Sequence, residues 1–85
     1  MRFHITTTIT LPPDLDPEVR ADLLERDRAW RAEHGVEQEV GGRRDFVVVD
    51  KPDAAELDAF LKHRPARWYA HYDVSLLQPA EPLPE

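Results

Sequence analysis

The sequence predicts an α+β fold in which two helices cover one face of a four-stranded antiparallel sheet. Strand-like and helix-like segments follow one another in the order β-α-β-β-α-β, and a Gly-Gly pair separates the two middle strands. Two right-handed crossovers place both helices on the same face, which is the ferredoxin-like arrangement. The 85 residues allow one such domain, expected at 1–78, followed by a Pro-rich C-terminal tail at 79–85.

The first strand is expected at residues 2–11, where apolar side chains alternate with His and Thr. A helix follows, because Asp16 can cap free N–H groups and Pro17 suits the first helical position. This helix is expected to run to about His34, since Gly35 is a typical helix stop.

The middle of the chain predicts a hairpin. Residues 36–40 are a short strand candidate, and Gly41-Gly42 is a hairpin turn signal. Residues 44–50 are apolar on both faces, which is typical of a central strand.

The second helix is expected to begin after Asp53, which has Glu56 at capping-box spacing, and to end before Pro65. Its apolar stripe consists of Ala54, Leu57, Phe60 and Leu61. Residues 68–77 alternate again and predict the last strand.

This topology leaves one sheet face uncovered. The side chains expected there are His4, Thr6, Thr8, His71, Asp73 and Ser75, with some of the valines of 44–50. A domain of this size has a marginal core, and with no cysteine it has no disulfide to support it. A half-apolar open face therefore predicts self-association into a homodimer or a larger homo-oligomer.

Composition excludes several classes of function. The net charge of −6 argues against nucleic acid as a partner, and no apolar run is long enough for a membrane span. The N-terminus lacks the apolar core of a signal peptide, so a cytoplasmic protein is expected. We find no phosphate loop, dinucleotide fingerprint or metal-ligand spacing, and we expect neither a metal nor an organic cofactor.

Asp27 is the most informative charged residue. It lies in the apolar stripe of the first helix, which Val19, Leu23 and Trp30 form with Leu24 at its edge. Burying an unpaired carboxylate is expensive, so Asp27 needs either a partner or a function. Asp27 is either one member of a structural ion pair, with Arg20, Arg28 or Arg31 as its partner, or a general base.

Other polar residues allow both a structural and a functional interpretation. His4, His71 and Asp73 are expected on the open face, where they are surface or interface residues or line a binding site. Arg43 and Arg44 follow the glycine turn and form either a solvated hairpin end or a clamp for an anionic group.

The N-terminal half carries a specific resemblance. The segment FHITTTITLPPDLDP resembles the opening of the muconolactone delta-isomerase family, at Phe3, His4, Thr8, Leu11, Pro12, Asp14, Asp16 and Pro17. Asp27-Arg28 resembles an acidic-basic pair in the first helix of that family. Looser matches follow at 46–52, 57–65 and 72–74.

The resemblance implies a ferredoxin-like fold in a dimeric α/β barrel, which assembles up to a decamer in the family. It implies a cofactor-free isomerase of aromatic hydrocarbon catabolism, in the catechol branch of the β-ketoadipate pathway. Such an enzyme shifts a ring double bond in an unsaturated lactone by proton transfer. The implied catalytic residues are Asp27, His4 and Arg28, and we expect substrate binding by Arg43, Arg44, His71, Asp73 and Trp30.

Two departures from the family leave other functions open. The segment 33–44 is several residues shorter than in the family, and Asp27 stands where the family has Glu. One alternative is a related enzyme of another, biosynthetic pathway that acts on a different enolisable cyclic substrate. Another is a non-catalytic oligomeric binding or scaffold protein. An enclosed pocket holding Asp27, His4 and a basic group favours an enzyme, whereas a filled barrel, with Asp27 tied to Arg20 or Arg31, favours a scaffold.

Overall fold

The computed structural model describes residues 1–80 and contains the predicted six elements in the predicted order. These are β1 (Arg2–Ile9), α1 (Pro17–Glu33), β2 (Glu37–Gln38), β3 (Arg44–Asp50), α2 (Ala54–Lys62) and β4 (Ala70–Leu77), with a 3-10 turn at Arg67–Tyr69. Of the predicted tail, residues 81–85 lie outside the described residues. Neither helix within residues 1–80 has the length and apolar content that a membrane span requires.

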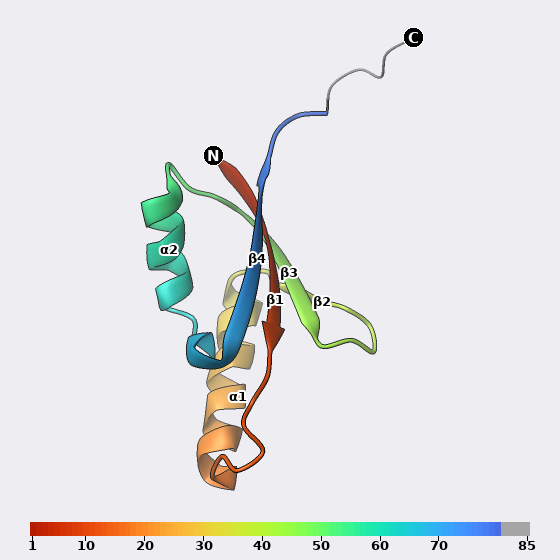
Figure 1. Ribbon diagram of the computed structural model, residues 1–85, viewed down its shortest axis with the longest axis vertical. Coiled ribbons are helices and arrows are strands. Elements are labelled where there is room, and N and C mark those ends of the chain that lie inside the picture. Colours follow the sequence, from red (N-terminus) through yellow and green to blue (C-terminus); the bar gives the residue numbers. More distant parts are fainter. Residues whose placement is uncertain (81–85) are drawn as a thin grey trace.

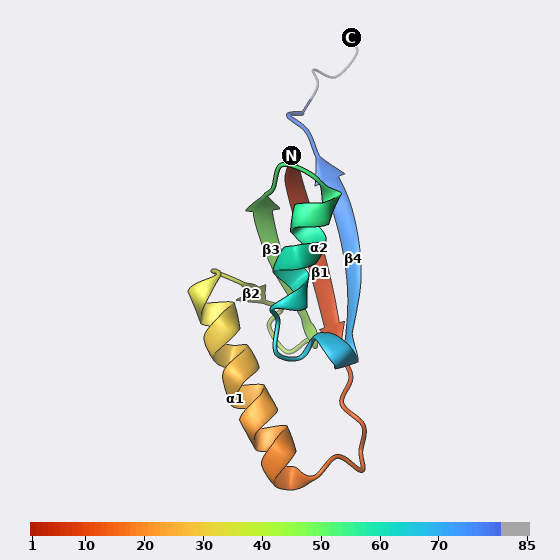
Figure 2. The same cartoon turned by 90° about the vertical axis from the view of Figure 1, so that its left-hand side faces the viewer.

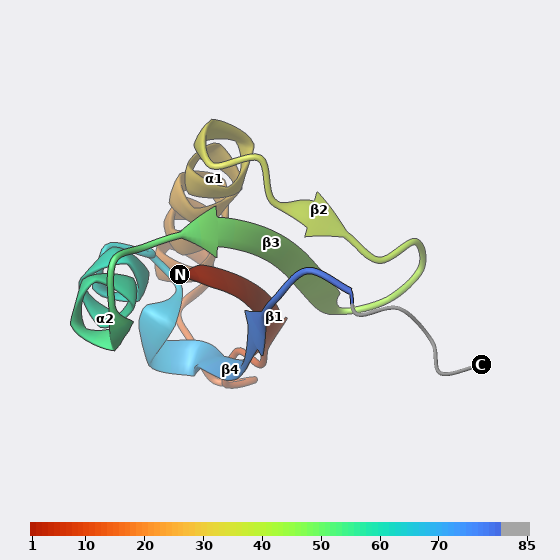
Figure 3. The same cartoon turned by 90° about the horizontal axis from the view of Figure 1, so that it is seen from above.

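The sheet has the strand order β2-β3-β1-β4, and every neighbouring pair is antiparallel. Seen edge-on, both helices lie on one side of the sheet (Figure 1), and the view from above shows the other side uncovered (Figure 3). The predicted ferredoxin-like α+β fold is therefore confirmed, and β3 is an internal strand as predicted.

The helix boundaries follow from the residues that mark them in the sequence. The Asp16 side chain accepts hydrogen bonds from the backbone N–H groups of Glu18 and Val19. Asp53 accepts one from the N–H of Glu56 at 2.9 Å. After α1, Gly35 has a φ of 66°, which a residue with a side chain adopts only with strain.

The hydrophobic core lies between α2 and the central strands. It consists of Phe3, Ile5, Val47 and Leu57, with Val36, Val49, Phe60, Leu61 and Tyr72 packed around it. The inward residues of β1 and β3 recur at every second position, as the period of a strand requires. This packing fixes which side chains of β1 and β3 face the helices.

Two local predictions were wrong. The last strand begins at Ala70 and not at residue 68, because Arg67–Tyr69 form the 3-10 turn. Val19 and Leu24 are 53% and 42% exposed, although both were assigned to the apolar stripe of α1. The N-terminal half of α1 extends past the end of β1, so its side chains there have no sheet to pack against (Figure 2).

The open face of the sheet carries the predicted side chains. His4 lies opposite Val48 on β3 and Ser75 on β4. Thr6 and Thr8 lie opposite Asp73 and His71 on β4. Val48 is 43% exposed, so this face combines polar side chains with apolar surface.

Candidate functional site

A buried arginine, Arg64, organises the charged residues on the helix-covered side of the sheet. It lies just after α2 and its side chain is 1% exposed. Its Nε donates to Asp27 Oδ1 at 3.1 Å and its Nη2 donates to Asp27 Oδ2 at 3.0 Å. Asp27 is therefore held by a bidentate ion pair, the strongest geometry for this contact.

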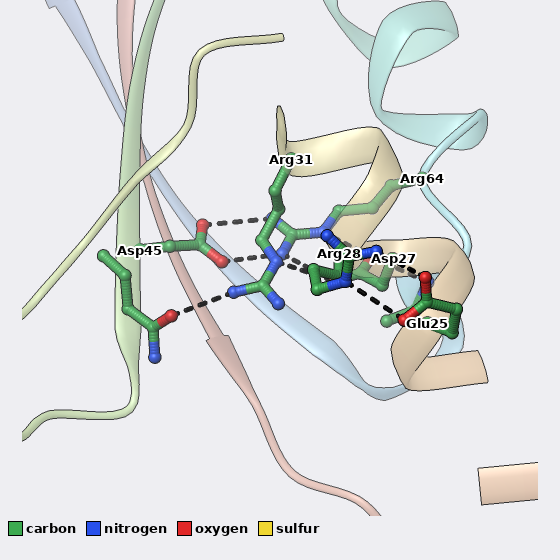
Figure 4. Close-up of polar contacts among 8 residues, drawn as sticks. Glu25, Asp27, Arg28, Arg31, Asp45 and Arg64 are labelled. Carbon is green, nitrogen blue, oxygen red and sulfur yellow. Dashed lines mark hydrogen bonds and ion pairs between the residues drawn. The ribbon is translucent and has the colours of Figure 1, made fainter. Parts of the chain in front are cut away.

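The same guanidinium holds a second carboxylate, that of Asp45 on β3. Nη1 of Arg64 donates to Asp45 Oδ1 at 3.1 Å, and Nη2 donates to Asp45 Oδ2 at 2.6 Å. Figure 4 shows the two carboxylates approaching Arg64 from α1 and from β3. We call Asp27, Asp45 and Arg64 the Asp-Arg-Asp cluster.

The cluster connects three parts of the fold. Asp27 comes from the middle of α1, Asp45 from the inner face of β3, and Arg64 from the turn that follows α2. The backbone N–H of Ala66 also donates to Asp27 Oδ1 at 3.2 Å, which ties the same turn to α1. The Arg64 guanidinium lies 5.1 Å from the centre of the Trp30 ring, within cation–π distance.

The charges of the cluster do not cancel, since two carboxylates share one guanidinium. Burial alone lowers the pKa of Arg64, but the hydrogen bonds that Arg64 donates to Asp45 and Asp27 outweigh burial and raise this pKa above its ordinary value. Arg64 is therefore fixed as a cation. The nearest further cation is Arg31, whose Nε lies 3.5 Å from Asp27 Oδ2.

Both carboxylates line an open cleft of about 450 Å³ between α1, the end of β1 and the turn before β3. Four arginines line the same cleft, namely Arg20, Arg31, Arg43 and Arg44. Arg31 is oriented by Gln38, whose Oε1 accepts from its Nη1 at 3.1 Å. The cleft can therefore bind a small anionic molecule beside two carboxylates.

The structure brings together only some of the residues that the sequence singled out. Asp27, Arg43 and Arg44 line one cleft, and Trp30 lies next to Arg64 behind it. Arg28 lies on the exposed face of α1 and pairs with Glu25, its Nε donating to Glu25 Oε2 at 3.0 Å. It is thus neither a partner of Asp27 nor a lining residue of the cleft.

His4, His71 and Asp73 lie on the open face, on the other side of the sheet from the cleft. The His4 ring is 5.9 Å from that of Phe46, and His71 Nε2 is 3.5 Å from Asp73 Oδ1. An enclosed pocket holding both Asp27 and His4 is therefore absent from the single chain over residues 1–80. His4 points from β1 to the open face, whereas Asp27 projects from α1 on the helix-covered side. The two side chains therefore lie on opposite sides of the sheet.

Sequence reasoning missed Arg64 and Asp45. Of the three arginines considered as partners of Asp27, only Arg31 approaches it, and Arg64 is 37 residues away in sequence. A signal for Asp45 exists, because it shares the inward alternation of β3 with Val47 and Val49. Arg64 lies in a short turn, where no periodic pattern indicates burial.

Tyr72 lies near the cluster but does not titrate in the neutral range. Burial raises its pKa, and the charges of Asp27 and Asp45 add to that effect against the opposing charge of Arg64. Within residues 1–80 its hydroxyl has no hydrogen-bond partner. Tyr72 therefore stays protonated and is unsuited to act as a base near pH 7.

The comparisons with known proteins give a fold relationship. No family model and no curated protein matches the chain. A solved structure does match it along its whole length. Its protein is muconolactone isomerase. The match covers 100% of this chain and 98% of the isomerase, with a TM-score of 0.80 and 22% sequence identity. The chain thus has the fold of muconolactone isomerase, as the sequence resemblance predicted.

Proposed function

We propose that the protein is a cofactor-free isomerase of the cytoplasm that moves a ring double bond in a small unsaturated lactone bearing a carboxylate. The observation that carries the proposal is the cleft, in which Asp27 and Asp45 lie beside four arginines. Its volume of about 450 Å³ lies within the usual range for small-ligand sites. The shared fold with muconolactone isomerase supports the same class of reaction.

The proposed reaction needs only one proton carrier. A carboxylate removes a proton from a ring carbon activated by the lactone carbonyl, and the negative charge spreads over the conjugated oxygen as an enolate. The same group then returns the proton to the carbon two positions away. No atom is gained or lost overall.

The arginines have two roles in this proposal. Of the four arginines that line the cleft, Arg31 stands closest to Asp27, and it places a positive charge where the enolate oxygen develops. Arg43 and Arg44 line the same cleft and bind the carboxylate of the substrate, which replaces Glu39 Oε2 as the acceptor, now 2.8 Å from Arg44 Nε. His4, His71, Asp73 and Arg28 have no part in this chemistry, because none of them lines the cleft.

Turnover can be tested directly by proton NMR in D₂O with muconolactone and then with a panel of other enolisable lactones. We expect loss of one vinyl signal and appearance of another, and any deuterium at the reprotonated carbon measures how far the carried proton exchanges with solvent before it is returned. Treatment with a chelator should leave the rate unchanged. Lack of turnover on every lactone would contradict the proposal, and loss of activity together with a bound metal would contradict its cofactor-free form.

One observation favours a second candidate, a non-catalytic binding protein. Both oxygens of Asp27 already accept hydrogen bonds from Arg64, as expected for a structural ion pair. In that case the arginine-lined cleft binds a carboxylate without transforming it. Saturable binding of muconolactone by calorimetry, with no turnover in the NMR assay, would favour this candidate.

We also propose that the chain forms a homodimer or a larger homo-oligomer through its open sheet face. The support is the marginal size of the core and the exposed apolar surface around Val48. This proposal assigns His4, His71 and Asp73 to the interface between copies.

Val48→Asp is expected to convert the oligomer into monomers, because it places a charge on the apolar part of the open face. Light scattering across a dilution series measures the change. Val40→Asp is the matched control, since Val40 is 101% exposed on the β2–β3 turn. A folded wild-type monomer of 9.8 kDa at micromolar concentration would contradict self-association.

A further inference from the structure

The geometry points to Asp45, rather than Asp27, as the carboxylate that exchanges a proton with the substrate. Asp27 and Arg64 are then positioning residues that hold Asp45 in place. This inference rests on the proposed isomerase function, and it goes beyond the sequence resemblance, which implies Asp27 for the same role.

The first argument is a count of hydrogen bonds. An ionised carboxylate offers about four acceptor positions. Asp27 uses three of them for Arg64 Nε, Arg64 Nη2 and the N–H of Ala66, and Arg31 Nε stands 3.5 Å from its Oδ2. Asp45 accepts only two hydrogen bonds among the described residues, one on each oxygen. Asp45 therefore keeps acceptor capacity on both oxygens.

The second argument is position in the cleft. Asp45 is 5% exposed and Asp27 2% exposed, and both line the cleft. Asp45 follows Arg43 and Arg44 directly in the chain, so the residues proposed to bind the substrate carboxylate adjoin it. A substrate anchored at these arginines lies against β3, where Asp45 is the first inward-facing side chain.

The third argument is charge. The Asp-Arg-Asp cluster has one more negative than positive group, so uptake of one proton makes it neutral. Arg64 stays charged, because its two carboxylate partners raise its pKa. The proton must therefore reside on a carboxyl group, and Asp45 is the one with more unused acceptor positions.

The step balances without a co-reactant. A C–H bond of the ring carbon that is conjugated with the lactone carbonyl through the double bond breaks, the proton moves to an oxygen of Asp45, and the electron pair enters the conjugated enolate. The O–H bond of Asp45 then breaks as the proton joins the carbon two positions away. The protein returns to its starting state.

The test compares Asp45→Asn with Asp27→Asn in the lactone assay. Asp45→Asn preserves shape and should lower kcat about 10²–10⁴-fold, the usual contribution of general acid–base catalysis. It should leave KM unchanged, because the arginines proposed to bind the substrate are retained. Asp27→Asn should lower kcat less, since the carboxylate of Asp45 is retained.

Each outcome decides between the two carboxylates. Retention of wild-type kcat by Asp45→Asn, or a larger loss in Asp27→Asn than in Asp45→Asn, would overturn the inference while leaving an active isomerase. Absence of turnover in the wild-type protein would instead reject the proposed function, and this inference with it. If Asp45→Asn does not fold, Asp45→Glu retains the charge and displaces the carboxylate by one methylene. It should lose kcat by about tenfold or more, and an unchanged kcat would overturn the inference.

Discussion

Arg64→Met is expected to remove a large part of the protein's stability at 25 °C. Removing one partner of a buried ion pair destabilises a protein by about 3–5 kcal/mol, because the remaining charge stays buried without a partner. Here the substitution leaves two carboxylates, Asp27 and Asp45, facing one another without the guanidinium. Since an 85-residue domain has a free energy of unfolding of about 5–10 kcal/mol, most of its stability is lost. Urea unfolding followed by circular dichroism measures the change.

Two variants separate the geometry of Arg64 from charge alone. Arg64→Lys keeps the charge but cannot bind both carboxylates through paired N–H groups, so it should be destabilised as well. Lys62→Met is the matched control, because Lys62 pairs with Asp58 on the exposed face of α2. An exposed pair of this kind contributes about 0–1 kcal/mol. Near wild-type stability in Arg64→Met would contradict a structural role for the cluster.

A triple variant tests the cause of the expected instability. The triple variant removes all three charges and places apolar side chains at these positions, through Asp27→Leu, Asp45→Val and Arg64→Met. Replacement of a whole buried ion pair by apolar residues is often neutral or stabilising. We therefore expect the triple variant to recover most of the stability that Arg64→Met loses. Failure to recover would show that shape, and not buried charge, makes Arg64 necessary.

The fold could be predicted from the sequence because its signals are local. Asp16 and Asp53 cap the two helices, Gly35 ends the first, and residues 44–50 form the internal strand β3 as predicted. The exposure of Val19 could not be predicted this way, since it depends on how far α1 extends beyond the sheet (Figure 2). Periodicity reports which side chains share a helix face, but not whether another element covers that face.

The site was only partly predictable, for a related reason. Asp27 stands out in sequence because an acidic residue interrupts an apolar stripe, and it is indeed buried. Its main partner could not be named, because Arg64 reaches it through the packing of α2 and not through helical spacing. Asp45 could have been found from the alternation of β3, which places it on the same face as Val47. Asp27 and His4 lie on opposite sides of the sheet of one chain, so a shared catalytic role for the two stays a prediction.

Asp27→Asn is expected to destabilise the protein by about 1–3 kcal/mol, although it preserves the shape of the side chain, because buried donors of Arg64 lose an acceptor while Asp45 still balances the charge. The substituted amide group turns an N–H donor toward Arg64 Nη2, and Asp45 becomes the remaining buried partner of the guanidinium. Asp22→Asn on the same helix is the control, because Asp22 and Arg26 form an exposed pair. Thermal unfolding and lactone turnover should be measured on the same preparations. A midpoint at or above that of wild type, with turnover reduced about 10²–10⁴-fold, would instead identify Asp27 as the proton carrier.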